Sequence, residues 1–227
     1  GYLQGGKEIE FNRIYLVKIL KVLIPYALVT LFTFFLLKVR NILYGRTLIT
    51  MLFGFFDNGY TWYIEMYIGL FLLIPFINRS WNQLSHKEKK YLIWIMLFLS
   101  FLPVVFNKFD IIFQDYWCGL YPFAYYIVGM YIKEYGIKID QRKKIVILIL
   151  STVLHFILGI TIYRANIKSS YNTHNHPLVF VNAALVFDLL LGINTDNLGN
   201  KSRKVLGVIA DAVLSAYMIS YVTDIII

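Results

Sequence analysis

One acidic side chain interrupts an otherwise apolar stretch at residues 62–78. Glu65 lies a single turn inside this stretch, which begins with the aromatic pair Trp62 and Tyr63. A carboxylate at membrane depth is energetically expensive, so it suggests a functional role. Glu65 could accept a proton or orient a polar substrate. Two structural explanations stay open, namely pairing with a nearby base and solvation at the membrane interface.

A group of cations lies near the start of the first apolar run. Lys18 and Lys21 are three residues apart, so they share one face of a helix, and Arg13 lies one to two turns earlier. Such a stripe at the cytoplasmic end of a helix could hold the phosphates of a cytoplasmic donor. The same pattern is typical of positively charged anchors whose side chains snorkel to the membrane surface. The spacing leaves both explanations open.

The remaining ionisable residues suggest a polar interior. Four of them fall within apolar runs, namely His155, Asp188, Asp211 and Asp224, and Asp188 lies deep in its run. Ionisable residues at membrane depth predict either a polar tunnel or a network of ion pairs. In the preceding loop, His174 and His176 are separated by one residue, a spacing that metal sites also use. No third ligand accompanies them at helical or strand spacing, so we expect no metal. A pH-responsive or substrate-facing loop stays open beside a plain solvated loop.

The composition indicates that the solvent is a bilayer. Of the 227 residues, 59% are hydrophobic and 15% are charged, and the mean hydropathy is +0.63. A soluble domain of this length could not bury so much apolar surface. A net charge of +9 would suggest a nucleic-acid partner for a soluble protein. Here the basic residues gather in short loops between apolar runs, so we expect no nucleic-acid partner. The single Cys118 excludes an internal disulfide.

The apolar runs predict an all-α polytopic membrane bundle. A spanning helix needs about 20 apolar residues. About seven transmembrane helices are expected, from runs at 14–37, 62–78, 91–106, 119–132, 145–163, 177–193 and 205–227. The stretch 47–56 is too short to span and suggests an interfacial or re-entrant piece. Without repeats or linkers, residues 1–227 are expected to form a single membrane domain.

Successive loops alternate between a high and a low content of lysine and arginine. Loops assigned to the side of residue 1 carry 14 of these residues, whereas the alternate loops carry 6. Cytoplasmic loops are enriched in Lys and Arg, so the residue 1 side is expected to be cytoplasmic.

Three segments of the chain resemble acyltransferase family 3, a family of bacterial membrane O-acyltransferases. The first is Gly1-Tyr2-Leu3, followed by a basic helix start and Pro25-Tyr26, with Lys18 and Lys21 at the family's Arg-x-x-Arg pair. The second is Trp62-Tyr63, followed by Ile68-Gly69-Leu70-Phe71-Leu72-Leu73 and Pro75. The third is Leu214-Ser215-Ala216-Tyr217-Met218-Ile219-Ser220.

The resemblance implies a fold and an activity. Family members have about ten helices, so the chain is expected to be a fragment that lacks about two helices before residue 1 and one after residue 227. The implied reaction moves an acyl group, commonly acetyl, from acyl-CoA to a sugar hydroxyl of an envelope or secreted glycan. No cofactor is expected beyond acyl-CoA as donor substrate. The implied location is the bacterial inner membrane.

The resemblance also implies roles for individual residues. Arg13, Lys18 and Lys21 would meet the phosphates of acyl-CoA, the two lysines as point charges rather than bidentate donors. Trp62 and Tyr63, which belong to the second matching segment, would lie on the acceptor side. Glu65, as a candidate catalytic residue, and the loop residues His174 and His176 are expected on the same side from their positions along the chain rather than from the resemblance. The catalytic His of the family is expected before residue 1, and Ser220 stands near the place of a second, late His. The fragment by itself is therefore expected to be inactive.

Two other classes of function stay open. A polysaccharide transporter or polymerase is also aromatic-rich and polytopic, although neither a large outer loop nor paired repeats are visible. A non-catalytic membrane module that binds a ligand or partner is the other. A His in a preceding helix would distinguish the enzyme from the binding module.

Overall fold

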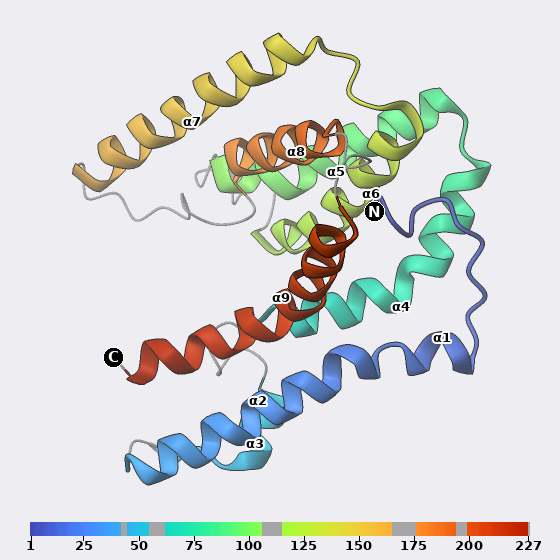
Figure 1. Cartoon of the computed structure of the whole chain (residues 1–227). Helices are drawn as coiled ribbons and strands as arrows, with labels where there is room; N and C mark the ends of the chain where they lie inside the picture. The colour runs from blue at the N-terminus through green and yellow to red at the C-terminus, as the bar shows by residue number, and fades with distance from the viewer. Residues whose placement is uncertain (42–44, 55–61, 106–114, 165–175, 194–198, 227) are drawn as a thin grey trace. The chain divides into compact units, whose positions relative to one another are not determined.

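The computed structural model describes residues 1–41, 45–54, 62–105, 115–164, 176–193 and 199–226. Throughout these ranges the regular elements are helices, in agreement with the predicted all-α class (Figure 1). They are α1 (Arg13–Val17), α2 (Leu20–Val39), α3 (Leu48–Phe53), α4 (Trp62–Gln83), α5 (His86–Val105), the 3₁₀ helix η2 (Asp115–Leu120), α6 (Tyr121–Tyr135), α7 (Gln141–Arg164), α8 (Pro177–Leu191) and α9 (Asn200–Ile226).

Two stretches among the described residues are long and apolar enough to cross a membrane by length and composition. These are Arg13–Val39, with a mean hydropathy of 2.1, and Gln141–Thr161, with 2.2. Pro177–Leu191 is also apolar but shorter. Seven transmembrane helices are therefore not confirmed, and that number stays a prediction. The short helix α3 agrees with the expectation that residues 47–56 do not span.

Helix ends follow capping groups rather than hydropathy. α5 begins at His86, five residues before its apolar run, because Ser85 and Glu88 form a reciprocal cap: Ser85 N–H donates to Oε2 of Glu88 at 2.7 Å, and Glu88 N–H donates to Oγ of Ser85 at 3.4 Å. α7 likewise starts at Gln141, ahead of the apolar run at 145–163. Basic residues predicted to lie in loops thus belong to first helical turns.

The run predicted as one helix at 14–37 is interrupted at residues 18–19. There the backbone switches to i→i−3 hydrogen bonds, from Lys18 N–H to Tyr15 O and from Ile19 N–H to Leu16 O, each 3.0 Å. This is 3₁₀ geometry, which tightens the chain to three residues per turn. The predicted run thus consists of the two helices α1 and α2 joined by this turn, and it lies within the candidate span Arg13–Val39.

The chain divides into two compact units, each described by itself. One contains Gly1–Glu8 and Phe76–Asn194, and the other contains Ile9–Pro75 and Thr195–Ile227. In the second unit, Val22, Tyr26 and Ile64 form a buried cluster. The hydroxyl of Tyr26 donates to the carbonyls of Met51 and Leu52 at 2.9 and 3.0 Å, which joins α2 to the last turn of α3.

In the first unit, α5 packs on α6 and η2, while α6 and α7 pack on α8. Aromatic rings fill part of this interface. The ring of Phe180 lies 4.9 Å from that of Phe101 and 4.8 Å from that of Tyr125, measured between centroids. These rings join the end of α5 to the starts of α6 and α8. At the other end of the same helix pair, the end of α6 contacts the start of α5 through the polar groups described below.

Candidate functional site

A buried tyrosine anchors α1, the helix that begins with Arg13. The ring of Tyr15 stacks on Phe71 of α4 with centroids 4.2 Å apart, and its hydroxyl donates to the Phe71 carbonyl at 2.5 Å. Asn12 caps the helix, since its Oδ1 accepts the N–H of Tyr15 at 2.9 Å. Tyr15 is 5% exposed. These contacts fix the inner face of α1, and Arg13, the basic residue of this helix, is exposed.

The three predicted donor-site cations are all exposed. Lys18 lies in the 3₁₀ turn and Lys21 in the first turn of α2, and Lys21 N–H donates to the carbonyl of Lys18 at 3.2 Å. At three residues per turn, positions i and i+3 lie one above the other, so both lysines share a face even though the helix is interrupted. No ion pair within the described ranges involves Arg13, Lys18 or Lys21. Their role in binding phosphate stays a prediction.

The predicted acceptor-side residues are described only in part. Trp62 and Tyr63 begin α4, and their side chains lie outside the described residues, as does the whole of His174. Glu65 is exposed in the first turn of α4. Among the side chains that the structure describes, none forms an ion pair with Glu65, so pairing with a base gains no support.

His176 lies at the start of α8, where its Nδ1 accepts the N–H of Leu178 at 3.3 Å. Its ring centroid is 5.5 Å from that of His155 in α7. Burial, followed by the charge of His155, lowers the pKa of His176 below its ordinary value. Since Nδ1 accepts a hydrogen bond, neutral His176 carries its proton on Nε2. Within the described part of the chain, no three His, Cys, Asp or Glu side chains gather as metal ligands would.

Asp188 forms an ion pair near two helix ends. It lies in the last turn of α8, which ends at Leu191, rather than deep in its run. The Nζ of Lys144, in the first turn of α7, is 2.5 Å from its Oδ2, and the two side chains are 14% and 12% exposed. Of the predicted polar interior, the structure thus accounts for Asp188 as one half of a pair. Asp211 and Asp224 lie on α9, and their side chains are not described.

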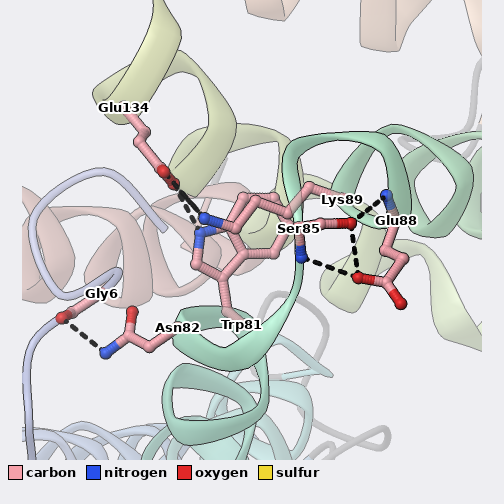
Figure 2. Close-up of polar contacts among 7 residues, drawn as sticks. All are labelled: Gly6, Trp81, Asn82, Ser85, Glu88, Lys89 and Glu134. Atoms are coloured by element: carbon pink, nitrogen blue, oxygen red, sulfur yellow. Dashed lines mark hydrogen bonds and ion pairs between the residues drawn. The ribbon is translucent and has the colours of Figure 1, made fainter.

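A second ion pair, absent from the sequence-based site, joins α5 to α6 (Figure 2). The Nζ of Lys89 donates to both carboxylate oxygens of Glu134, at 2.7 and 2.9 Å, and the indole N–H of Trp81 donates to Oε2 at 2.9 Å. Burial alone would raise the pKa of Glu134. Hydrogen bonds from Lys89, Tyr135 and Trp81, with the charge of Lys89, outweigh this effect and lower the pKa. The carboxylate therefore stays ionised at neutral pH.

Asn78 fastens the first residues of the chain to α4 and α6. Its side-chain amide donates to the carbonyls of Gln4 and Lys7 at 2.7 and 3.0 Å, and its Oδ1 accepts the hydroxyl of Tyr126 at 2.8 Å. One turn later, Asn82 donates to the carbonyl of Gly6 at 3.2 Å, as Figure 2 shows. The i, i+4 spacing of the two asparagines at the end of an apolar run was the available signal for this role.

These contacts bring together three loops that the charge count assigns to one side of the membrane. The loop at the start of the chain contacts the end of α4, and Lys133 at the end of α6 donates to the carbonyl of Gly5 at 2.8 Å. The pair of Lys89 with Glu134 joins the start of α5 to the same place. The three segments therefore contact one another, while their assignment to one side of a membrane stays a prediction.

Comparison with known proteins decides the family. The sequence profile of the acyltransferase domain family matches residues 2–227. The chain belongs to acyltransferase family 3. No curated protein and no solved structure shows significant similarity to it. The match covers both compact units, so the helices that carry the cations and those that carry the ion pairs lie within one acyltransferase domain.

The basic side chains of the described residues differ in whether a carboxylate neutralises them. Lys89 and Lys144 are each neutralised by a carboxylate at 2.5–2.7 Å. Such pairs hold helices together and leave little charge for a substrate. The exposed cations Arg13, Lys18 and Lys21, by contrast, take part in no ion pair within the described residues.

Proposed function

We propose that this protein transfers an acyl group, in particular acetyl, from acyl-CoA to a sugar hydroxyl of an envelope or secreted glycan. We further propose that it lies in the bacterial inner membrane with the residue 1 side in the cytoplasm, as a bundle of about seven transmembrane helices over this length. Acyltransferase family membership supports the reaction class. The donor, the acceptor and the location are the proposal.

The observation that carries the donor assignment is the exposed stripe of Arg13, Lys18 and Lys21. It lies at the N-terminal end of the span Arg13–Val39. Acyl-CoA carries several phosphates far from its thioester, and exposed ammonium groups with no carboxylate partner can contact them directly. Tyr15 supports this role because its buried contacts with Phe71 fix the inner face of α1, on which Arg13 is exposed.

On the acceptor side, we propose Glu65 as a residue that orients the sugar or accepts its hydroxyl proton. Its exposure in the first turn of α4 leaves the carboxylate accessible. In the reaction, the sugar oxygen attacks the acyl carbonyl carbon, the thiolate of CoA leaves, and the hydroxyl proton goes to a base. Trp62, Tyr63, His174 and His176 would contribute to the acceptor pathway.

The test is transfer of radiolabelled acetyl from acetyl-CoA in membranes that contain the full-length gene product. The double variant Lys18→Ala plus Lys21→Ala should raise the KM for acetyl-CoA about tenfold, since two exposed charge contacts together contribute about 1.4 kcal/mol. The kcat should change less, because the phosphates lie far from the reacting carbonyl. Arg142→Ala plus Lys143→Ala, which removes two exposed cations from the start of α7, is the matched control.

Unchanged KM and transfer in the Lys18/Lys21 variant would refute the donor assignment. The variant Lys18→Arg plus Lys21→Arg keeps both charges and should retain transfer. If the protein binds acetyl-CoA but transfers no acetyl group to any glycan fraction, the proposal of an enzyme is replaced by that of a non-catalytic ligand-binding module.

A further inference from the structure

A cavity of about 380 Å³ lies beside the starts and ends of helices in the unit that contains residues 76–194. Its lining comes from His86 and Lys90 of α5, Tyr131 of α6 and the turn at residues 136–139. Small-ligand pockets typically measure about 300–1,000 Å³. The cavity therefore has room for a phosphate together with one planar ring. None of the proposed acyl-transfer residues lines it.

The cavity is lined by basic side chains. His86 and Lys90 are four residues apart on α5, so they project from the same helix face. Lys138 approaches from the turn after α6, and all three side chains are exposed. Neither Lys90 nor Lys138 takes part in an ion pair within the described residues.

The neighbouring carboxylates are already committed to other groups. Glu134 binds Lys89 and Trp81, as described above. Glu88 accepts hydrogen bonds from the hydroxyl and backbone N–H of Ser85, and these bonds lower its pKa. Asp140 accepts the backbone N–H of Arg142 at 3.1 Å. Within the described ranges no ion pair joins any of these carboxylates to Lys90 or Lys138, so both ammonium groups can contact a ligand from outside.

Two of the residues that line the cavity, His86 and Tyr131, carry aromatic rings. The ring of His86 lies nearly parallel to that of Tyr131, with an interplanar angle of 21° and centroids 6.0 Å apart, and 4.3 Å from the ring of Tyr135. Gly136 ends α6 with a φ of +66°, a conformation that favours glycine, and so turns the chain back toward α5. This turn brings Lys138 to the cavity.

We propose that this cavity binds a phosphate-bearing ligand. Lys90 and Lys138 would contact the phosphate oxygens, while His86 and Tyr131 would lie against a ring or sugar attached to the phosphate. A soluble nucleotide and the headgroup of an anionic phospholipid both offer this chemistry. The inference does not rest on the acyl-transfer proposal, because it uses other residues and is measured by binding rather than turnover.

The experiment has a soluble arm and a lipid arm. Calorimetry of the full-length protein in detergent measures the binding of ADP and of inorganic phosphate. Reconstitution into nanodiscs of phosphatidylglycerol or phosphatidylcholine, followed by native mass spectrometry, measures retained lipid. The variant Lys90→Ala plus Lys138→Ala should lower the affinity for whichever of these ligands the wild type binds by about tenfold, the loss expected from two exposed charge contacts. If the aromatic faces take part, ADP should bind more tightly than phosphate.

Lys87→Ala plus Lys143→Ala is the matched control, since it removes two exposed lysines that do not line the cavity. Weakened binding of ADP alone identifies a soluble nucleotide as the ligand, and weakened retention of phosphatidylglycerol alone identifies a headgroup. Lys90→Arg plus Lys138→Arg should preserve binding. The proposal is overturned if the Lys90/Lys138 variant, folded by circular dichroism, matches the control and wild type in both arms.

Discussion

The ion pair between Lys89 and Glu134 predicts an asymmetric response to mutation. Lys89 is buried, with its side chain 8% exposed, whereas the side chain of Glu134 is 39% exposed. Removing the carboxylate by Glu134→Ala leaves a buried ammonium group and the buried indole N–H of Trp81 without their acceptor. Removing the ammonium group by Lys89→Met leaves a carboxylate that water already reaches. We therefore expect Glu134→Ala to be the more destabilising change.

The expected magnitudes follow from the burial of each partner. Breaking a fully buried pair costs about 3–5 kcal/mol. Water at the exposed side of Glu134 reduces this, so Glu134→Ala should lower the free energy of unfolding by about 2 kcal/mol. Lys89→Met should cost less than about 1 kcal/mol, because it also removes the cost of burying a charge. In the double variant the cost should be well below the sum of the two single ones.

Reversible unfolding of the purified protein in mixtures of a mild detergent and dodecyl sulfate measures these free energies, with Lys87→Met as the exposed control on the same helix. The pKa of Glu134 lies below its ordinary value of 4.5, so the stabilisation by its charge is present above pH 4.5. It is lost as the pH falls through the lowered pKa. The difference between wild type and Glu134→Gln should therefore shrink on acidification. A larger cost for Lys89→Met than for Glu134→Ala would refute the reasoning.

Two further predictions concern buried hydrogen bonds. Asn78→Ala should cost about 2–3 kcal/mol of unfolding free energy, because it removes the partners of two backbone carbonyls and of the Tyr126 hydroxyl. It should also accelerate proteolysis before residue 9. Tyr126→Phe removes only one of these hydrogen bonds, so it should cost about 1 kcal/mol and leave the proteolysis rate near that of wild type. Tyr15→Phe should cost about 1 kcal/mol of unfolding free energy, because it loses the hydrogen bond to the Phe71 carbonyl. Tyr15→Ala also loses the stacked ring and should cost about 3–5 kcal/mol. Equal costs for the two variants would show that the ring does not anchor α1.

Much of the helical framework was predictable from local patterns. The runs at 62–78 and 177–193 share their first residues with α4 (Trp62–Gln83) and α8 (Pro177–Leu191), because apolar side chains over that length favour a helix in a membrane. The boundaries were less predictable. The cap formed by Ser85 and Glu88 starts α5 ahead of its apolar run, and hydropathy does not register capping bonds.

The candidate site was predictable only where exposure and spacing were enough. The shared face of Lys18 and Lys21 follows from their three-residue spacing, in an α-helix or a 3₁₀ turn alike. The position of Asp188 could not be predicted in this way, since its partner Lys144 is 44 residues earlier in the chain. An acidic residue within an apolar run is expected both when its carboxylate lines a polar tunnel and when it forms an ion pair, so the sequence alone does not distinguish the two.

The sequence by itself determined that the chain is helical and that it contains stretches apolar enough to cross a membrane, because composition and hydropathy accumulate along the chain without reference to packing. The side on which each loop lies stays a prediction from loop charge. Family membership likewise follows from the sequence. Only the tertiary structure decided which cations are neutralised. Lys89 and Lys90 are adjacent in sequence, yet one is buried against a carboxylate 45 residues away and the other lines an open cavity. Adjacent positions on a helix face different surroundings, so packing rather than residue type assigns their roles.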